Sequence, residues 1–166
     1  MKIKNVTVAG TGVLGSQIAF QTAFKGFHVS AYDINDEALE KAKERFKVLQ
    51  ERYQQDKYGT KEEVEAAYNR ISLFTDLAKA VENADLVIEA VPELLDIKQK
   101  FYRDLSQVAK KETIFASNSS TMTPSQIVDF TGRPERYLHL HFANEIWRLN
   151  IAEIMKHDGT SPEVFD

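Results

Sequence analysis

Apolar positions along this chain follow two repeating patterns that take turns. Short β-branched and apolar runs, typical of buried strands, alternate with longer segments whose apolar residues recur every three or four positions, as in an amphipathic helix. The runs predict strands at 3–9, 27–32, 71–74, 85–91, 113–116, 136–142 and 149–154. The longer segments predict helices at 13–25, 36–58, 61–68, 77–83, 94–109 and 124–130. This alternation indicates an α/β protein with a doubly wound, mostly parallel sheet.

Two of the expected helices, 36–58 and 61–68, follow each other without a strand between them. The apolar residues of the first form one stripe at helical spacing, namely Leu39, Ala42, Phe46, Leu49 and Tyr53. Gly59 and Thr60 break this pattern before the second helix begins. We therefore expect a helical hairpin inserted after the second strand. The spacing leaves open whether the hairpin only packs on itself or also forms an arm that contacts substrate or a partner subunit.

The expected helix at 94–109 has an apolar stripe of its own. It consists of Ile97, Phe101, Leu105 and Val108, and these residues are expected to face the sheet. Lys98 lies off this stripe, one turn inside the helix, where a lysine is ordinarily solvated.

Composition then limits the class of protein. At 166 residues the chain is long enough for one domain with a substantial core. A net charge of −4 gives no basic surface, which argues against nucleic acid as a partner, and the absence of cysteine excludes disulfides, thiol catalysis and cysteine-ligated metal. No run approaches the ~18 apolar residues of a membrane span. The first residues show no secretory signal, so we expect a cytoplasmic protein.

Three glycines join the first expected strand to the first expected helix. Gly10, Gly12 and Gly15 stand in G-x-G-x-x-G spacing, in which the first allows a tight turn, the second a close approach to a pyrophosphate, and the third close packing of helix and strand. The N–H groups at the start of such a helix face the anion. The spacing alone is weak evidence, but its place between a strand and a helix favours a Rossmann-type dinucleotide site.

An acidic residue stands where such a site needs one. Asp33 ends the second expected strand, 23 residues after Gly10, close to the ~20 at which an acid accepts from a ribose 2′-hydroxyl. By itself an aspartate there could equally cap a turn or a helix, but the glycines favour the cofactor role. Ile34 and the two residues after it include no arginine for a 2′-phosphate, which favours NAD over NADP.

Polar residues also follow two later strands. Residues 89–93 carry a glutamate at each end, and residues 117–121 read Ser-Asn-Ser-Ser-Thr. Ligands of open α/β sheets bind at the carboxyl ends of the strands, so both segments are well placed for a site. Glu93 could instead only cap the next helix, and the polar cluster could be only a loop with a helix cap.

Two histidines and a glutamate lie late in the chain. His139 and His141 alternate on one expected strand and so share a face, and Glu153 lies 12 residues beyond His141, on what should be the neighbouring strand. A carboxylate that holds a histidine fixes its tautomer and makes it a good general base. From spacing alone a structural histidine is the better interpretation. A metal site would need a third ligand, and none has convincing spacing.

The chain ends at the start of a helix. Thr160 and Ser161 precede Pro162 in the arrangement of a cap followed by proline at the first helical position, and the chain stops at Asp166. A domain rarely ends one turn into a helix. We therefore expect the N-terminal part of a longer protein.

Four motifs in combination resemble the NAD-binding domain of the L-3-hydroxyacyl-CoA dehydrogenase family. They are residues 10–15 with Asp33, residues 84–93, residues 117–122 and residues 139–144. The resemblance spans essentially the whole chain, and the last motif is most similar to diketoreductase-like members. It implies one NAD-binding Rossmann-like domain at 1–166. It also implies a C-terminal helical domain, absent from this chain, that supplies a homodimer interface and much of the substrate pocket.

The resemblance implies roles for individual residues. His141 matches the family's general base, with Glu153 as its carboxylate partner, and Ser120 matches a contact to the substrate oxygen. Glu93 and Lys98 match contacts to the nicotinamide end of the cofactor. The expected catalytic residues are His141, Glu153, Ser120 and Asn118. The expected cofactor-binding residues are Gly10, Thr11, Gly12, Val13, Leu14, Gly15, Asp33, Ile34, Ala90, Val91, Glu93, Lys98 and Asn118.

The chain departs from the family pattern beside the substrate. After His141 the family usually continues Phe-Phe-Asn-Pro, whereas this chain has Ala143 and Glu145 at the second and fourth of these places. Trp147 and Arg148 also replace residues that are commonly smaller or apolar. The resemblance therefore implies the redox chemistry more firmly than the preference for an acyl-CoA.

The implied activity is that of an NAD-dependent oxidoreductase acting on a small molecule. It would interconvert a 3-hydroxyacyl-CoA and its 3-keto form by hydride transfer, with His141 as general base or acid. One alternative is a ketone or diketo-ester reductase, or a sugar-acid dehydrogenase, on the same scaffold. Another is an NAD-binding module that is inactive without its C-terminal domain.

Overall fold

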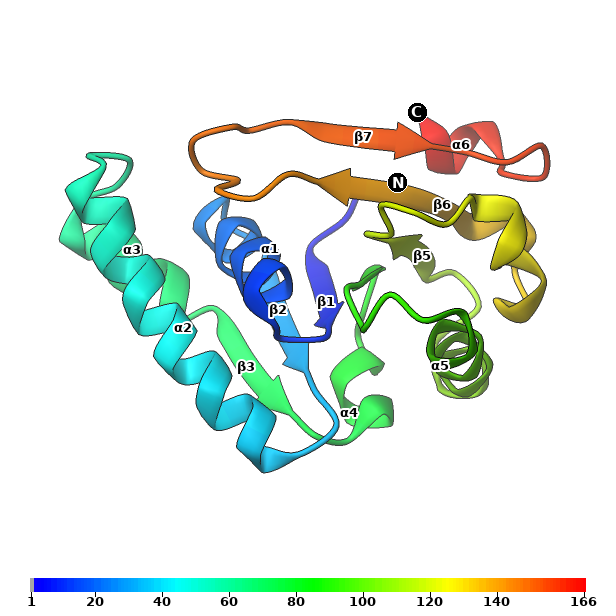
Figure 1. The fold of residues 1–166 in the computed structure, drawn as a ribbon, viewed down its shortest axis with the longest axis horizontal. Helices are drawn as coiled ribbons and strands as arrows, with labels where there is room; N and C mark the ends of the chain where they lie inside the picture. Colours follow the sequence, from blue (N-terminus) through cyan, green and yellow to red (C-terminus); the bar gives the residue numbers. More distant parts are fainter. Residues whose placement is uncertain (1) are drawn as a thin grey trace.

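The computed structural model describes residues 2–166, which form one seven-stranded sheet with helices on both faces (Figure 1). The strands are β1 (Asn5–Ala9), β2 (His28–Tyr32), β3 (Ile71–Phe74), β4 (Leu86–Glu89), β5 (Ile114–Ser117), β6 (Tyr137–Phe142) and β7 (Ala152–Met155). They lie in the order β3-β2-β1-β4-β5-β6-β7, and every neighbouring pair is parallel except β6 with β7. The doubly wound, mostly parallel sheet is thus confirmed.

The strand order reverses between β1 and β4. From β1 the chain builds outward through β2 to β3, and it then crosses back to build outward through β4 to β7. Ala9 at the end of β1 pairs with Glu89 at the end of β4, so the two strands finish level with each other. In a sheet of this kind the ligand crevice opens at such a reversal, outside the carboxyl ends of the strands.

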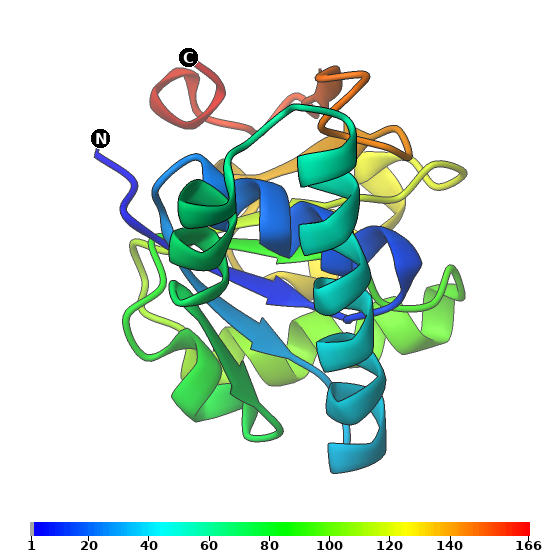
Figure 2. The same ribbon diagram turned by 90° about the vertical axis from the view of Figure 1, so that its left-hand side faces the viewer.

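The helices form one layer on each face of the sheet. They are α1 (Val13–Phe24), α2 (Asp36–Gln55), α3 (Lys61–Tyr68), α4 (Leu77–Val81), α5 (Leu95–Val108) and α6 (Pro162–Phe165). Figure 2 looks onto α2 and α3, which cover α1 and, behind it, the sheet. On the opposite face lie α4 and α5. No helix among residues 2–166 is long and apolar enough to cross a membrane.

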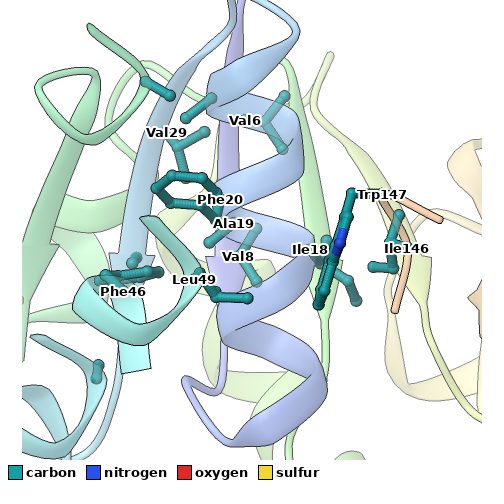
Figure 3. Close-up of a cluster of buried hydrophobic side chains, with 14 of the residues drawn as sticks. Val6, Val8, Ile18, Ala19, Phe20, Val29, Phe46, Leu49, Ile146 and Trp147 are labelled. Atoms are coloured by element: carbon teal, nitrogen blue, oxygen red, sulfur yellow. The ribbon is translucent and has the colours of Figure 1, made fainter. Parts of the chain in front are cut away.

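The alternation of side chains along the central strands fills both layers. Val6 and Val8 of β1 pack under α1 (Figure 3), whereas Thr7 faces the other way and donates from its hydroxyl to the Ala80 carbonyl at 2.7 Å. The predicted apolar stripe of α2 is buried throughout. The ring of Phe20 on α1 lies edge-on to that of Tyr53, with the ring centroids 4.9 Å apart. The hairpin α2–α3 is therefore confirmed, and it packs on α1 as well as on itself.

Local capping explains several helix ends. Thr60 and Glu63 form a reciprocal capping box at the start of α3, and the side chain of Asn35 accepts from the Ala38 N–H at the start of α2. Gly26 follows α1 with φ of +97°, the left-handed conformation that ends a helix. Pro162 stands at the first position of α6, as its sequence predicts.

Other predicted elements need correction. The segment 124–130 is not one helix but two 3₁₀ turns, η1 (Pro124–Gln126) and η2 (Val128–Phe130), because the φ of −116° at Ile127 interrupts helical geometry; a third, η3 (Pro134–Arg136), precedes β6. The last strand begins at Ala152 rather than at residue 149, because Leu149 donates its N–H to the Glu145 carbonyl in a turn. Helix α2 ends at Gln55 rather than at residue 58.

The buried face of α5 is also rotated from the predicted stripe. Its buried residues are Lys98, Phe101, Tyr102 and Leu105. Ile97 and Val108 are 37% and 41% exposed, so the prediction that they face the sheet is wrong, as is the prediction of a solvated Lys98. The lysine takes an inward position because two carboxylates compensate its charge there.

Candidate cofactor and active site

Two of the three glycines in the β1–α1 turn are required by packing. Gly10 has a φ of +94°, and a Cβ atom there would lie 2.4 Å from the Ala90 carbonyl oxygen at the end of β4. A Cβ atom at Gly15 would lie 1.9 Å from the Gly10 carbonyl oxygen. The turn is therefore pressed against the neighbouring strand and against its own helix, and only glycine fits at these two positions.

Gly12 differs because nothing fills the space beside it. A Cβ atom at Gly12 would meet no atom within 4 Å. This open space lies at the N-terminus of α1, which has no side-chain cap and no acidic residue in its first turn. The N–H groups of a helix start lack intrahelical partners and carry a partial positive charge. The turn thus fits the pyrophosphate of a dinucleotide, which a side chain at Gly12 would displace.

Asp33 lies beside the same turn. Its Oδ2 accepts from the backbone N–H of Thr11 at 2.8 Å and from the Thr11 hydroxyl at 2.6 Å, and its Oδ1 accepts from the Ile34 N–H at 2.8 Å. These bonds hold the carboxylate at the rim of the crevice. Each carboxylate oxygen has two lone pairs, so further acceptor capacity is left for ribose hydroxyls.

Two cavities open at the carboxyl ends of the central strands. The larger, of about 580 Å³, lies between the glycine turn, Asp33 and α5, and its wall includes Ile97 and Phe101. The smaller, of about 240 Å³, extends from the glycine turn to Glu93, Asn118 and other residues. Every residue expected from the sequence to bind the cofactor lines one of the two, and Ser120 lines the smaller. An apolar cavity with a few polar groups is the usual form of a cofactor site.

Lys98 joins two carboxylates in the interior. Its Nζ lies 2.5 Å from Glu89 Oε1 and 3.1 Å from Glu93 Oε2, and both Lys98 and Glu89 are almost fully buried. The other oxygen of Glu89 accepts from the Ser117 hydroxyl at 2.6 Å. Each buried charge in this group is therefore paired and hydrogen-bonded, as burial requires. The role of Glu89 escapes sequence analysis because it depends on a lysine that the helical pattern assigns to solvent.

Glu93 links this group to the loop after β5. Its Oε1 accepts from the hydroxyl of Ser119 and, at 3.0 Å, from that of Thr121. Burial raises the pKa of Glu93, but hydrogen bonds from Ser119 and Lys98 outweigh this effect and lower the pKa to about 2. Glu93 is thus an ionised anchor for residues 119–121. It does not serve as the N-cap of α5, which is Leu94.

The two histidines of β6 have different surroundings. His141 Nδ1 lies 2.9 Å from Glu153 Oε2, and the two residues are direct partners in the antiparallel pair of β6 and β7. The side chain of His141 is 26% exposed, and its contact with Glu153 uses Nδ1 and not Nε2. His139 is fully buried, with its Nε2 2.8 Å from the Tyr137 hydroxyl. Burial lowers the pKa of His139 to about 4, so this ring is neutral at neutral pH.

The candidate substrate contacts lie at the same edge of the sheet. Ser117 at the end of β5 pairs with His139 in β6, so the residues that follow Ser117 lie near the end of β6. Asn118 Oδ1 accepts from the Phe142 N–H at 2.9 Å, which fixes the loop against the strand of His141. Ser120 is exposed at the rim of the smaller cavity. Among residues 2–166 there is no group of three or more His, Asp or Glu side chains that could hold a metal ion.

A basic pair near Asp33 was not predicted from the sequence. Lys41 and Arg45 on α2 line a hollow of about 270 Å³ beside Asp33 and Ile34. Arg45 Nη1 donates to the Thr11 carbonyl at 3.3 Å, and Lys41 pairs with Glu37 at 2.6 Å. They do not follow Asp33 directly in the sequence but reach the hollow from the second and third turns of α2.

Comparisons with known proteins agree with this geometry. Residues 5–166 match the family described as the NAD-binding domain of 3-hydroxyacyl-CoA dehydrogenase. A probable 3-hydroxybutyryl-CoA dehydrogenase of Bacillus subtilis is 37% identical over 163 residues, which cover 98% of this chain and 56% of that protein. The mitochondrial hydroxyacyl-coenzyme A dehydrogenase of Homo sapiens is 33% identical over 169 residues, covering 99% and 54%.

A solved structure gives the same result at higher identity. The structure of a diketoreductase, described as a dual catalyst of dicarbonyl compounds, superposes with a TM-score of 0.97 at 54% identity, covering 99% of this chain and 59% of that one. The chain thus spans little more than half the length of these relatives. NAD is the cofactor of the matched domain. The chain belongs to the 3-hydroxyacyl-CoA dehydrogenase family, as its NAD-binding domain.

Proposed function

We propose that this chain is the NAD-binding part of an oxidoreductase that interconverts a 3-hydroxyacyl compound and its 3-keto form, with His141 as general base and acid. The observation that carries the proposal is the 2.9 Å contact between His141 Nδ1 and Glu153 Oε2. It lies next to Phe142, whose N–H donates to Asn118 in the lining of the smaller cavity. A histidine held in this way presents its Nε2 to a substrate hydroxyl.

The protein's own groups would move the proton. When bound, NAD supplies the hydride acceptor for oxidation and NADH the donor for reduction. In oxidation, Nε2 of His141 accepts the proton of the secondary hydroxyl, and the Glu153 carboxylate stabilises the imidazolium through Nδ1–H. Ser120 and Asn118 would hydrogen-bond the substrate oxygen. In reduction, protonated His141 returns the proton to the same oxygen.

The substrate class has two candidates with separate support. The matched family and the Bacillus and human relatives are named for acyl-CoA substrates. The 54% identical neighbour is a diketoreductase, named for dicarbonyl compounds, and it favours a ketone or diketo-ester substrate without CoA. A sugar-acid dehydrogenase remains a third, less supported alternative. We infer the 3-hydroxyacyl-CoA as substrate, with the diketo ester as the alternative.

A substrate panel separates these candidates. The complete gene product is assayed by NADH absorbance with acetoacetyl-CoA and with β-keto and β,δ-diketo esters that lack CoA. A higher kcat/KM for acetoacetyl-CoA supports the first candidate, and a higher value for the diketo ester supports the second. No NADH-dependent reduction of any of them would contradict the proposed activity.

The 166-residue chain itself is expected to bind NAD and to turn over no substrate. We propose that a further segment, corresponding to the part of the relatives that this chain does not cover, supplies the rest of the substrate pocket and the interface of a homodimer. Calorimetric titration of the chain with NAD, beside the NADH assay and sedimentation of both proteins, tests these points. Failure of the chain to bind NAD would overturn the cofactor site itself.

The cellular compartment is a separate proposal. We propose a cytoplasmic protein with no nucleic-acid partner, although the human relative is mitochondrial. The net charge of −4 supports the absence of a nucleic-acid partner, since proteins that bind nucleic acid are ordinarily basic. Microscopy of the tagged complete gene product tests the compartment, and organellar signal would contradict it.

A further inference from the structure

The connection between β6 and β7 is fastened to the end of helix α2 by one carboxylate. Asp56, the C-cap of α2, accepts three hydrogen bonds of 2.7 Å from two consecutive residues of that connection. The Trp147 indole N–H and the Arg148 Nε–H both donate to Oδ2, and Arg148 Nη2 donates to Oδ1. The arginine is therefore bidentate, which fixes direction as well as distance.

The tryptophan in this contact belongs to the core. Trp147 is 2% exposed, and its ring centroid lies 5.1 Å from that of Tyr53 on α2. Figure 3 shows it beside Ile18 of α1, with Ile146 next to it. A buried indole N–H needs an acceptor, and Asp56 provides it. Hydrogen bonds from Arg148 and Trp147 lower the pKa of Asp56 to about 2, so the carboxylate stays charged under ordinary assay conditions.

The turn that contains these residues is held at a second point. Glu145 has a φ of +58°, a left-handed conformation that residues with a side chain rarely adopt. Its N–H donates to Gln17 Oε1 of α1 at 2.7 Å, and its carbonyl accepts from the N–H groups of Arg148 and Leu149. Such a conformation persists only where the surroundings determine it.

The strand on the far side of the connection is exposed and is paired on one side only. All four residues of β7 are exposed, and β7 is the edge strand of the sheet. Glu153 stands on it, and its pairing with His141 is one step from the connection, since Phe142 pairs with Ala152. A slip of one residue in such a pair turns every side chain to the other face.

We propose that Asp56 is a positioning residue, which acts through Arg148 and Trp147 to fix the β6–β7 connection and thereby to hold Glu153 opposite His141. The hairpin α2–α3 thus supports the proton-transferring pair without touching it. For its effect on turnover this inference rests on the proposed function. The structural part of the inference, that Asp56 fixes the β6–β7 connection, does not depend on the proposed function. The structural and the functional effects are therefore measured separately.

The structural part is tested by hydrogen exchange on the 166-residue chain. Asp56→Asn removes the charge and the bidentate acceptor, while Glu51→Gln, an exposed position one turn earlier on α2, removes the same charge as a matched control. We expect faster exchange at 139–155 in Asp56→Asn only, with β1 and β2 unchanged. Trp147, the single tryptophan, should emit at longer wavelength in that variant. Unchanged exchange and emission would overturn the proposal whether or not the enzyme is active.

The functional part uses the complete gene product. Asp56→Asn should lower kcat about ten- to a hundredfold, the size of effect seen when a reacting group is displaced by about 1 Å, and leave the Kd for NAD unchanged. The pH dependence of kcat/KM should move in the same direction as in Glu153→Gln. A lower kcat with an unmoved pH profile would show a general loss of structure and contradict the positioning role.

A milder variant covers the case in which Asp56→Asn does not fold. Arg148→Gln removes the bidentate contact by changing the exposed partner, Arg148. It leaves the hydrogen bond from the Trp147 indole to Asp56 intact. It should change exchange and pH profile in the same direction, by less. In the double variant the Arg148→Gln change should add nothing further to Asp56→Asn, because both remove one contact; independent, additive effects would contradict the clamp.

Discussion

His139 and His141 lie two residues apart on one face of β6, but they have different partners. His139 is fully buried, with its Nε2 at the Tyr137 hydroxyl, whereas the His141 side chain is 26% exposed and contacts the exposed Glu153 through Nδ1. The two rings are chemically identical, so their surroundings alone decide which can transfer a proton.

Substitution of the two histidines should therefore separate catalysis from stability. His141→Ala should lower kcat in the complete gene product by about 10²–10⁴-fold, the usual contribution of a general base. His139→Ala should mainly lower the free energy of unfolding, because it leaves a cavity and an unpaired Tyr137 hydroxyl. Steady-state kinetics and urea unfolding of each variant measure the two effects. Equal activities would show that His141 is not the base.

The buried histidine should also make stability depend on pH. Its pKa is lowered from 6.5 to about 4 in the folded protein, so the unfolded chain binds the extra proton first. Stability should fall as pH drops from about 6.5 to about 4, by up to roughly 3 kcal/mol. Urea unfolding at several pH values measures this slope, which His139→Phe should reduce. His28→Gln, which removes a histidine from the exposed start of β2, is the matched control.

Substitutions of Gly12 and Gly15 should affect different properties, namely the affinity for NAD and the stability of the fold. Gly12→Ala meets no atom within 4 Å, so the fold should keep its stability while affinity for NAD falls at least tenfold. Gly15→Ala places a methyl group against the Gly10 carbonyl and should destabilise the fold by about 1–3 kcal/mol or more. Calorimetry with NAD and thermal unfolding give both readings. Unchanged NAD affinity in Gly12→Ala would argue against a pyrophosphate at the turn.

Asp33 should set the preference for NAD. Asp33→Ser removes the acceptor for the ribose hydroxyl and the charge that repels a 2′-phosphate, and it leaves Arg45 and Lys41 at the adjacent hollow. The Kd for NAD should rise about tenfold, the equivalent of 1.4 kcal/mol, while the Kd for NADP falls. Asp36→Asn, at the exposed start of α2, is the control of equal charge. A parallel loss of both cofactors would mean that Asp33 only supports the turn.

Lys98, which lies between Glu89 and Glu93, should be essential for stability as long as the buried carboxylate of Glu89 is present. Lys98→Met leaves a buried carboxylate without its countercharge and should cost about 3–5 kcal/mol in the free energy of unfolding. Glu89→Met combined with Lys98→Met should recover much of that loss, because an apolar pair can replace a buried ion pair. Urea unfolding of both variants tests this, and a double variant weaker than the single one would contradict it.

Much of the fold follows from periodicity because its elements are locally consistent. The α2 stripe from Leu39 to Tyr53 and the break at Gly59 and Thr60 predict the hairpin, and the structure has both, with Thr60 capping α3. The cofactor turn could be predicted in the same way, because the glycine spacing and the acidic residue at the strand end are both local features of the sequence. Where the pattern failed, at Lys98, a residue counted as polar was buried by partners 5 and 9 positions away, on another element.

Contacts between distant segments could not be found in this way. Trp147 and Arg148 were noted only as departures from a family pattern beside the substrate, whereas the structure places the indole in the core and the guanidinium on Asp56, 92 residues earlier. Nothing in the local sequence of Asp56 distinguishes it from the other acids of α2. Only the folded chain shows which of them meets the β6–β7 connection.

The exposed β7 strand gives the two halves of the site different resistance to local opening. The glycine turn and Asp33 follow β1 and β2, which are paired on both sides, whereas Glu153 stands on an edge strand with a single neighbour. Edge segments with few buried contacts open at lower free energy than the centre of a domain. Gentle heating or mild denaturant should therefore displace Glu153 and stop proton transfer while the nucleotide is still bound. Loss of activity should then precede release of the cofactor.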